Sequence, residues 1–226
     1  MQLAVFNSIF IRIIVGFIIG SGLSFIGTQI EKILLKKREL ELVRVKYEKY
    51  IILVTTGIFG SVVMWRMSYS INAIYLFVLL IIGQVIVLSD THHRIIPNDT
   101  LLAILIVKLA FGIPYLLGIK GFPQFNVPQS ILGMVVSFVI FVIPSFMGNN
   151  IGLGDVKLAG CVGFCLGLLG SMAAIVLMGM FELLYTVLQR KEPILIMLKN
   201  MLPMGPFMIF GMMAVLLFIP DSMMFF

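Results

Sequence analysis

The sequence contains few charged residues for its length. Only 12% of the 226 residues are Asp, Glu, Lys or Arg, whereas 61% are hydrophobic. A soluble domain carries about 25% charged residues. The polar residues are too few to cover a water-soluble globule, so lipid must be the solvent for much of the surface. We predict an all-α, polytopic integral membrane protein that forms one membrane-embedded domain over residues 1–226.

Cysteine and histidine are also scarce, which argues against a metal site. Cys161 and Cys165 lie four residues apart, and His92 and His93 are the two histidines. A tetrahedral zinc site needs about four ligands, and no second Cys or His pair stands at a spacing that would complete one. We interpret the cysteines as small apolar residues on one helix face, and we predict neither a metal nor a cofactor.

Basic residues are concentrated in one segment, since seven of the sixteen lie between Lys32 and Lys49. In a membrane protein such a cluster is typical of a cytoplasmic loop, so we expect lipid headgroups and not nucleic acid as its partner. Two structures fit this basic loop, residues 31–50, equally well. One is a surface helix on anionic lipid, and the other is an extension of the flanking helices into the cytoplasm.

The lengths of the apolar runs set the number of membrane spans. A helix needs about 20 apolar residues to cross about 30 Å of hydrocarbon. The runs 51–88 and 155–190 are each too long for one crossing, so we expect a turn at 65–70 in the first and at Gly163, Gly167 and Gly170 in the second. The sequence therefore predicts about eight transmembrane helices: one each at 3–27, 99–118, 127–147 and 203–220, and two within each long run.

The charges of the connecting loops predict the orientation. With alternating sides, the loops on one side hold twelve Lys and Arg, and the opposite loops hold two, Arg66 and Lys120. Because Lys and Arg are enriched in cytoplasmic loops, the first side is predicted to be cytoplasmic, with both termini outside. Asp90 and Asp155 then lie at the cytoplasmic boundary of the membrane.

Acidic residues are few, and five of the ten lie in two basic loops, residues 31–50 and a second loop at residues 190–200. Of the others, Asp99 is well placed to cap a helix, and Glu182 lies at a depth that suits an ion pair with Lys108. Asp90 and Asp155 differ because each stands at a membrane boundary, beside sequence that breaks a helix.

These two carboxylates suit hydrolysis. Gly152 and Gly154 allow close approach and unusual backbone conformations beside Asp155. Two carboxyl groups that lie together share a proton, so one activates water while the other polarises a peptide carbonyl. The helix dipoles favour Asp155 as the base and Asp90 as the acid. A proton relay or ion site in a transporter is the alternative from the residues alone.

At these residues the sequence resembles the type IV prepilin peptidases, aspartic endopeptidases of the inner or cytoplasmic membrane. The stretch Asp90 to Pro97, followed by Asn98, and the segment Gly152-Leu153-Gly154-Asp155-Val156-Lys157-Leu158 are similar to the paired motifs of that family. Two further segments resemble family motifs more loosely, Gly20-Ser21-Gly22-Leu23-Ser24-Phe25 and Pro203-Met204-Gly205-Pro206-Phe207.

The resemblance implies a function and a set of site residues. Asp90 and Asp155 would be the catalytic pair, and the residues that bind substrate or shape the site would be Gly152, Gly154, Lys157, Pro97 and Asn98. The substrate would be a prepilin or pseudopilin, cut after a short basic leader that ends in Gly, just before its hydrophobic helix. Archaeal preflagellin peptidases are related enzymes that the same residues fit.

The sequence departs from the larger bacterial members in one respect. Those members carry a cytoplasmic insert with two CxxC pairs that bind zinc, associated with N-methylation of the new terminus. Here the corresponding residues, 28–50, contain no cysteine, so we predict no methyltransferase activity and no S-adenosylmethionine.

A presenilin-like intramembrane protease is a further alternative, because GxGD also occurs there. Those proteases place Tyr before the first aspartate, whereas Ser89 stands at that position here. The resemblance to prepilin peptidases is therefore the better match, and it implies no particular oligomeric state.

Overall fold

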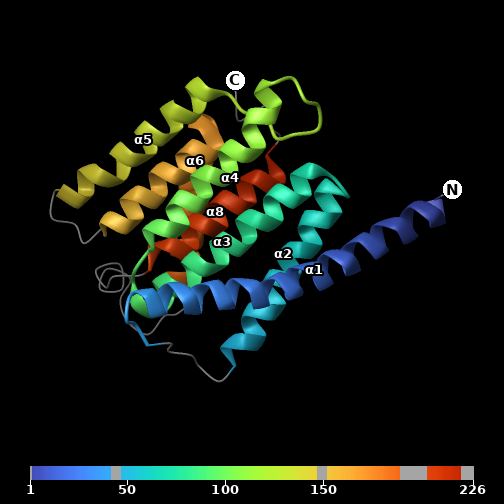
Figure 1. Cartoon of the computed structure of the whole chain (residues 1–226), viewed down its shortest axis with the longest axis horizontal. Coiled ribbons are helices and arrows are strands. Elements are labelled where there is room, and N and C mark those ends of the chain that lie inside the picture. The colour runs from blue at the N-terminus through green and yellow to red at the C-terminus, as the bar shows by residue number, and fades with distance from the viewer. Residues whose placement is uncertain (1, 42–46, 147–151, 189–202, 220–226) are drawn as a thin grey trace.

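The chain is a bundle of apolar helices (Figure 1). The computed structural model describes residues 2–41, 47–146, 152–188 and 203–219. Within these ranges it contains no strand, and the helices are α1 (Gln2–Lys37), α2 (Glu48–Met67), α3 (Ile71–His93), α4 (Asn98–Leu116), α5 (Val127–Phe146), α6 (Leu153–Leu188) and α8 (Met204–Phe218). The predicted second basic loop, within 189–202, and Gly148–Asn150 lie outside the described residues.

The outside of the bundle is apolar, as expected for a surface in contact with lipid. Large hydrophobic side chains are exposed on several helices, including Ile18, Ile33, Leu102, Ile131 and Val176. Helices satisfy their own backbone polar groups, so they can span hydrocarbon where open strands cannot. Six helices in the described part are long and apolar enough to cross a membrane, and α8 is a shorter apolar helix. The predicted fold class, an all-α polytopic membrane protein, is confirmed.

Helix α6 reverses direction at Gly167. This residue has φ 70° and ψ −176°, a non-helical conformation with positive φ that favours glycine. Ala159 before it and Met178 after it line the same small cavity, although a straight helix would separate them by about 28 Å. The predicted turn in the run 155–190 is therefore present. About eight spans were predicted. The described residues contain six helices of spanning length plus α8, and one of the six, α6, consists of two antiparallel arms.

Glycines bring α1 and α2 into close contact. A Cβ atom on Gly16 would lie 2.3 Å from the Gly60 carbonyl oxygen, and one on Gly20 would lie 2.3 Å from the Thr56 carbonyl oxygen. Small residues four apart allow this approach in membrane helices. Gln84 of α3 then joins the same pair of helices to the core, because its Nε2 donates to the Ser24 carbonyl at 3.0 Å.

Contacts at one end of the bundle join the loops that were predicted to be cytoplasmic. Lys37 at the end of α1 pairs with Asp99 at the start of α4, and Lys157 Nζ donates to Asn98 Oδ1 at 3.4 Å. His92 at the end of α3 pairs with Glu48 at the start of α2. These contacts confirm the grouping of the first three loops in their described parts, whereas the side of the membrane stays a prediction.

At the opposite end of the bundle, two basic side chains make contacts between helices. Arg12 donates to Ser68 Oγ at 2.5 Å, and Arg66 Nε donates to the Leu217 carbonyl at 3.2 Å. Figure 1 shows the N-terminal part of α1 extending away from the bundle at this end.

Two sequence expectations need correction. The basic loop is shorter than 31–50, because α1 continues as a helix to Lys37 and α2 starts at Glu48; of the two structures considered, helix extension is correct for these parts. The expected ion pair of Lys108 with Glu182 is wrong. Lys108 donates to the Gln124 carbonyl and lies 5.4 Å from the centre of the Phe125 ring, whereas Glu182 lies on the second arm of α6, which packs against α8.

The α1–α2 contact predicts a position-dependent effect of a single methyl group. Gly16→Ala should lower the free energy of unfolding by about 1–3 kcal/mol, because its Cβ overlaps the backbone of α2. Gly22→Ala is the matched control, since a Cβ at Gly22 meets no atom within 4 Å. Thermal unfolding in detergent measures both, and equal melting temperatures would contradict the close approach.

Candidate active site

Asp90 lies in the last turn of α3 and is 4% exposed. The helix ends because Arg94 adopts the left-handed conformation, φ 52°, and its N–H donates to the Asp90 carbonyl. Pro97 follows in an extended conformation and starts α4. Asp90 is therefore held on the buried side of a helix end, close to the loop that leads into the next helix.

The start of α8 holds the Asp90 carboxylate. The Gly205 N–H donates to Asp90 Oδ2 at 2.8 Å. It is one of the N–H groups in the first turn of a helix that have no partner within the helix, and Pro206 beside it has no N–H to offer. A Cβ at Gly205 would lie 2.7 Å from Asp90 Oδ2, so only glycine fits without displacing the carboxylate.

Asp155 lies in the first turn of α6. Its N–H donates to the Gly152 carbonyl at 3.0 Å, and the Val156 N–H donates to the same oxygen at 3.2 Å. Asp155 Oδ1 is buried and has no hydrogen-bond partner among the described residues. One carboxylate oxygen is therefore shielded from solvent without a hydrogen bond to any residue that the structure describes.

Gly152 and Gly154 are needed for space and not for unusual torsion angles. Neither has a positive φ, so the expected special backbone conformation is wrong. A Cβ on Gly152 would lie 3.2 Å from Asp155 Oδ2, and one on Gly154 would lie 3.3 Å from Ile96 Cβ. The glycines let the start of α6 pack directly against the loop after Asp90.

The structure brings the two aspartate motifs together. Gly154 contacts Ile96, and Lys157 contacts Asn98. Asp90 and Asp155 are close enough for the charge of one to act on the other. Asp90 and Asp155, which are 65 positions apart in the sequence, thus form one candidate site with two carboxyl groups.

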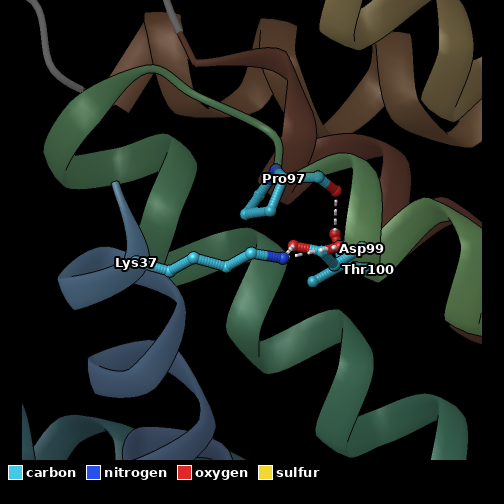
Figure 2. A network of polar contacts seen from close by, with 4 residues as sticks. All are labelled: Lys37, Pro97, Asp99 and Thr100. Carbon is cyan, nitrogen blue, oxygen red and sulfur yellow. Dashed lines mark hydrogen bonds and ion pairs between the residues drawn. The ribbon is translucent and has the colours of Figure 1, made fainter. Parts of the chain in front are cut away.

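Pro97 precedes the first turn of α4 and is its N-cap residue (Figure 2). Its carbonyl accepts a hydrogen bond from Thr100 Oγ1 at 2.6 Å. In Figure 2, Lys37 reaches from α1 to Asp99, with 3.3 Å between Nζ and Oδ2. The expected capping role of Asp99 is wrong, because Pro97 is the N-cap and Asp99 points to Lys37.

The described residues contain no cluster of three or more His, Cys, Asp or Glu side chains that could hold a metal ion. Both cysteines are free and buried, and the Cys161 thiol donates to the Leu101 carbonyl with 3.8 Å between sulfur and oxygen. They pack as small side chains, as the sequence suggested.

Sequence reasoning missed Gly205 as a site residue. It lies 115 positions after Asp90, and no spacing rule connects the two. The available signal was the segment Pro203-Met204-Gly205-Pro206. A glycine between two prolines at the start of a helix indicates that another group packs closely against the backbone there.

Fold and site together define a polytopic helical membrane protein with paired carboxyl groups at one end of its bundle. A family model described as the type IV leader peptidase family matches residues 73–187, which are 115 of the 226 residues. The chain belongs to the type IV leader peptidase family, and it is therefore a membrane-embedded peptidase. No curated protein and no solved structure matches the chain.

The contact between α8 and Asp90 predicts that one methyl group at Gly205 impairs peptidase activity. Gly205→Ala should slow cleavage of a leader-bearing substrate about tenfold to a hundredfold, because its Cβ displaces the Asp90 carboxylate. Gly179→Ala, where a Cβ meets no atom within 4 Å, should cleave at the unchanged rate. The measurement is the cleavage rate of each variant at equal amounts of folded protein. A fully active Gly205→Ala variant would contradict the contact between Gly205 and Asp90.

Proposed function

We propose that this protein is an aspartic endopeptidase that removes the basic leader of type IV prepilins or pseudopilins, with Asp90 and Asp155 as its catalytic pair. The observation that carries the proposal is the meeting of these two carboxyl groups at two helix ends, with Asp155 Oδ1 buried and unused by the described fold. Such a pair holds one proton more readily than two charges.

The hydrogen bond from Gly205 decides which oxygens are available for chemistry. Asp90 Oδ2 accepts from Gly205, which leaves Oδ1 of Asp90 for the shared proton. On Asp155, Oδ1 has no hydrogen-bond partner among the described residues and is the oxygen we assign to the shared proton or the water molecule. The carboxylate takes a proton from water as the water oxygen attacks the peptide carbonyl carbon, and the carboxylic acid gives its proton to the carbonyl oxygen.

Collapse of the tetrahedral intermediate completes the reaction. The carboxyl group that received the proton from water gives it to the leaving nitrogen as the carbon–nitrogen bond breaks. The oxygen that was protonated by the other carboxyl group returns its proton, so the pair again holds one proton. The assignment of Asp155 as base and Asp90 as acid stays a prediction.

The proposed substrate follows from where the pair lies. Asp90 and Asp155 lie at the end of the bundle that is rich in Lys and Arg, and the positive-inside rule predicts that this end is cytoplasmic. A substrate with a basic leader and a following apolar helix would keep its leader in the cytoplasm and its helix in the lipid of the cell membrane. Its scissile bond then lies at the depth of Asp90 and Asp155.

Transport is the weaker alternative. Transporter sites lie near the bilayer midplane at broken helices, whereas Asp90 is in the last turn of α3 and Asp155 in the first turn of α6. Ser89, in place of Tyr, weighs against a presenilin-like protease.

Removing either carboxylate should abolish cleavage. Asp90→Asn and Asp155→Asn should each slow cleavage of a prepilin by about 10³-fold or more, because the amide neither takes up nor releases the shared proton. Asp99→Asn is the matched control: it removes a carboxylate at the same end of the bundle, exposed and paired with Lys37, and should cleave normally. The mobility shift of a co-expressed prepilin measures all three, and a fully active Asp90→Asn or Asp155→Asn variant would sink the proposal.

The cleaved product should carry an unmethylated N-terminus. Residues 28–50 contain no cysteine and so lack the zinc-binding pairs associated with methylation in larger relatives. Mass spectrometry of a pilin processed by this protein alone tests this expectation, and an N-methylated terminus would overturn it.

A further inference from the structure

An apolar groove lies between α2, α3 and α8. It encloses about 90 Å³, and its lining includes Thr55 and Phe59 of α2, Gly83 and Val87 of α3, and Ile209 and Phe210 of α8. We call it the α2–α8 groove. Helix α8 packs mainly on α6 and α3 and contacts α2 only slightly, which leaves this space open between them.

The groove suits an apolar occupant, because its polar side chains already have partners. Thr55 Oγ1 donates to the Ile51 carbonyl at 2.8 Å, and Thr56 Oγ1 donates to the Ile52 carbonyl at 2.7 Å. Gln84 Nε2 donates to the Ser24 carbonyl. A polar ligand would gain few hydrogen bonds here, whereas an apolar side chain would gain burial.

The groove begins one helical turn from Asp90. Ile209 stands four residues after Gly205, so the two share one face of α8. On α3, Val87 stands three residues before Asp90 and is its neighbour one turn away. The α3 lining continues to Leu80, which is about 15 Å along the helix from Asp90. The apolar surface thus runs from the candidate active site toward the middle of the bundle.

The groove is open at its side and bounded at its far end. Thr55 is exposed and Phe210 is 39% exposed, so both stand at the surface where lipid is expected. Farther from Asp90, the rings of Phe59 and Phe210 lie 5.3 Å apart, and Arg66 of α2 bonds to the Leu217 carbonyl of α8. An apolar helix that diffuses in lipid can reach the groove from its open side.

We infer that the α2–α8 groove receives an apolar side chain from the first turns of the substrate's apolar helix, so that the preceding peptide bond reaches Asp90 and Asp155. This inference rests on the proposed function. The chain that follows the scissile bond must leave the carboxyl pair toward the membrane interior, and the groove is an apolar surface that starts one helical turn from Asp90 and extends in that direction. A groove that only held a lipid chain would not need to lie next to Asp90.

Cysteine cross-linking tests the location directly. Thr55→Cys is combined with Asp155→Asn to retain the uncleaved substrate, in the full-length protein in lipid nanodiscs. A prepilin with single cysteines placed in turn along the first three turns of its apolar helix is then added and oxidised. We expect disulfide-linked product for cysteines on one face of that helix. Val54→Cys, the adjacent exposed residue outside the groove, is the matched control and should give little product.

Filling the groove tests its use in catalysis. Thr55→Trp, in the otherwise unchanged protein, should raise the KM for the full prepilin at least about tenfold. Its rate on a leader peptide that ends shortly after the cut, and so lacks the apolar helix, should match that of the unsubstituted protein. Val54→Trp should behave as the unsubstituted protein toward both substrates.

The outcomes separate this inference from the proposed function. If the unsubstituted protein does not cut prepilin, the proposed function fails. If it cuts prepilin but Thr55→Trp has an unchanged KM, or Thr55→Cys and Val54→Cys cross-link equally, the groove holds lipid only or another partner, and the inference is overturned.

Discussion

The structure depends on two carboxyl groups, buried Asp90 and half-buried Asp155, at one end of an apolar bundle. A buried carboxylate is costly unless it accepts hydrogen bonds or shares a proton. The Gly205 N–H donates one such bond to Asp90. Because two neighbouring carboxylates repel each other, the pair favours a state that holds one proton. The start of α8 must therefore lie close to Asp90, and the start of α6 close to the loop after it, which explains Gly205 and Gly154. Gly152 leaves room for the Asp155 carboxylate.

The rest of the fold positions the end of α3 and the starts of α6 and α8 at the same end of the bundle. The reversal at Gly167 returns the second arm of α6 toward the end at which α6 began, where Tyr185 packs against Phe207 near the start of α8. Helices α1 and α2 cross closely at their glycines and are joined to α3 through Gln84. The family model covers α3 to α6, whereas Gly205 and most of the groove lining lie outside the matched residues.

Much of this could be predicted from the sequence, because membrane helices are governed by a few strong constraints. Run lengths and loop charges predicted the helices, the turn in the run 155–190 and the grouping of Asp90 with Asp155. Asp99 and Lys108 were misassigned because their partners, Lys37 and Gln124, are chosen by tertiary packing that local patterns do not encode. Gly205 was missed for the same reason. For Gly152 and Gly154 the expected close approach is present, whereas the expected unusual backbone conformation is not, because close approach and positive φ both call for glycine.

The central claim is that Asp90 and Asp155 act as one unit through a shared proton. The most direct test is the single-turnover cleavage rate of the Asp90→Asn, Asp155→Asn double variant beside both single variants. Residues that act as a unit give non-additive losses, so the double variant should be no slower than the slower single variant. A double variant slower by the product of the two single losses would show independent roles and contradict the account.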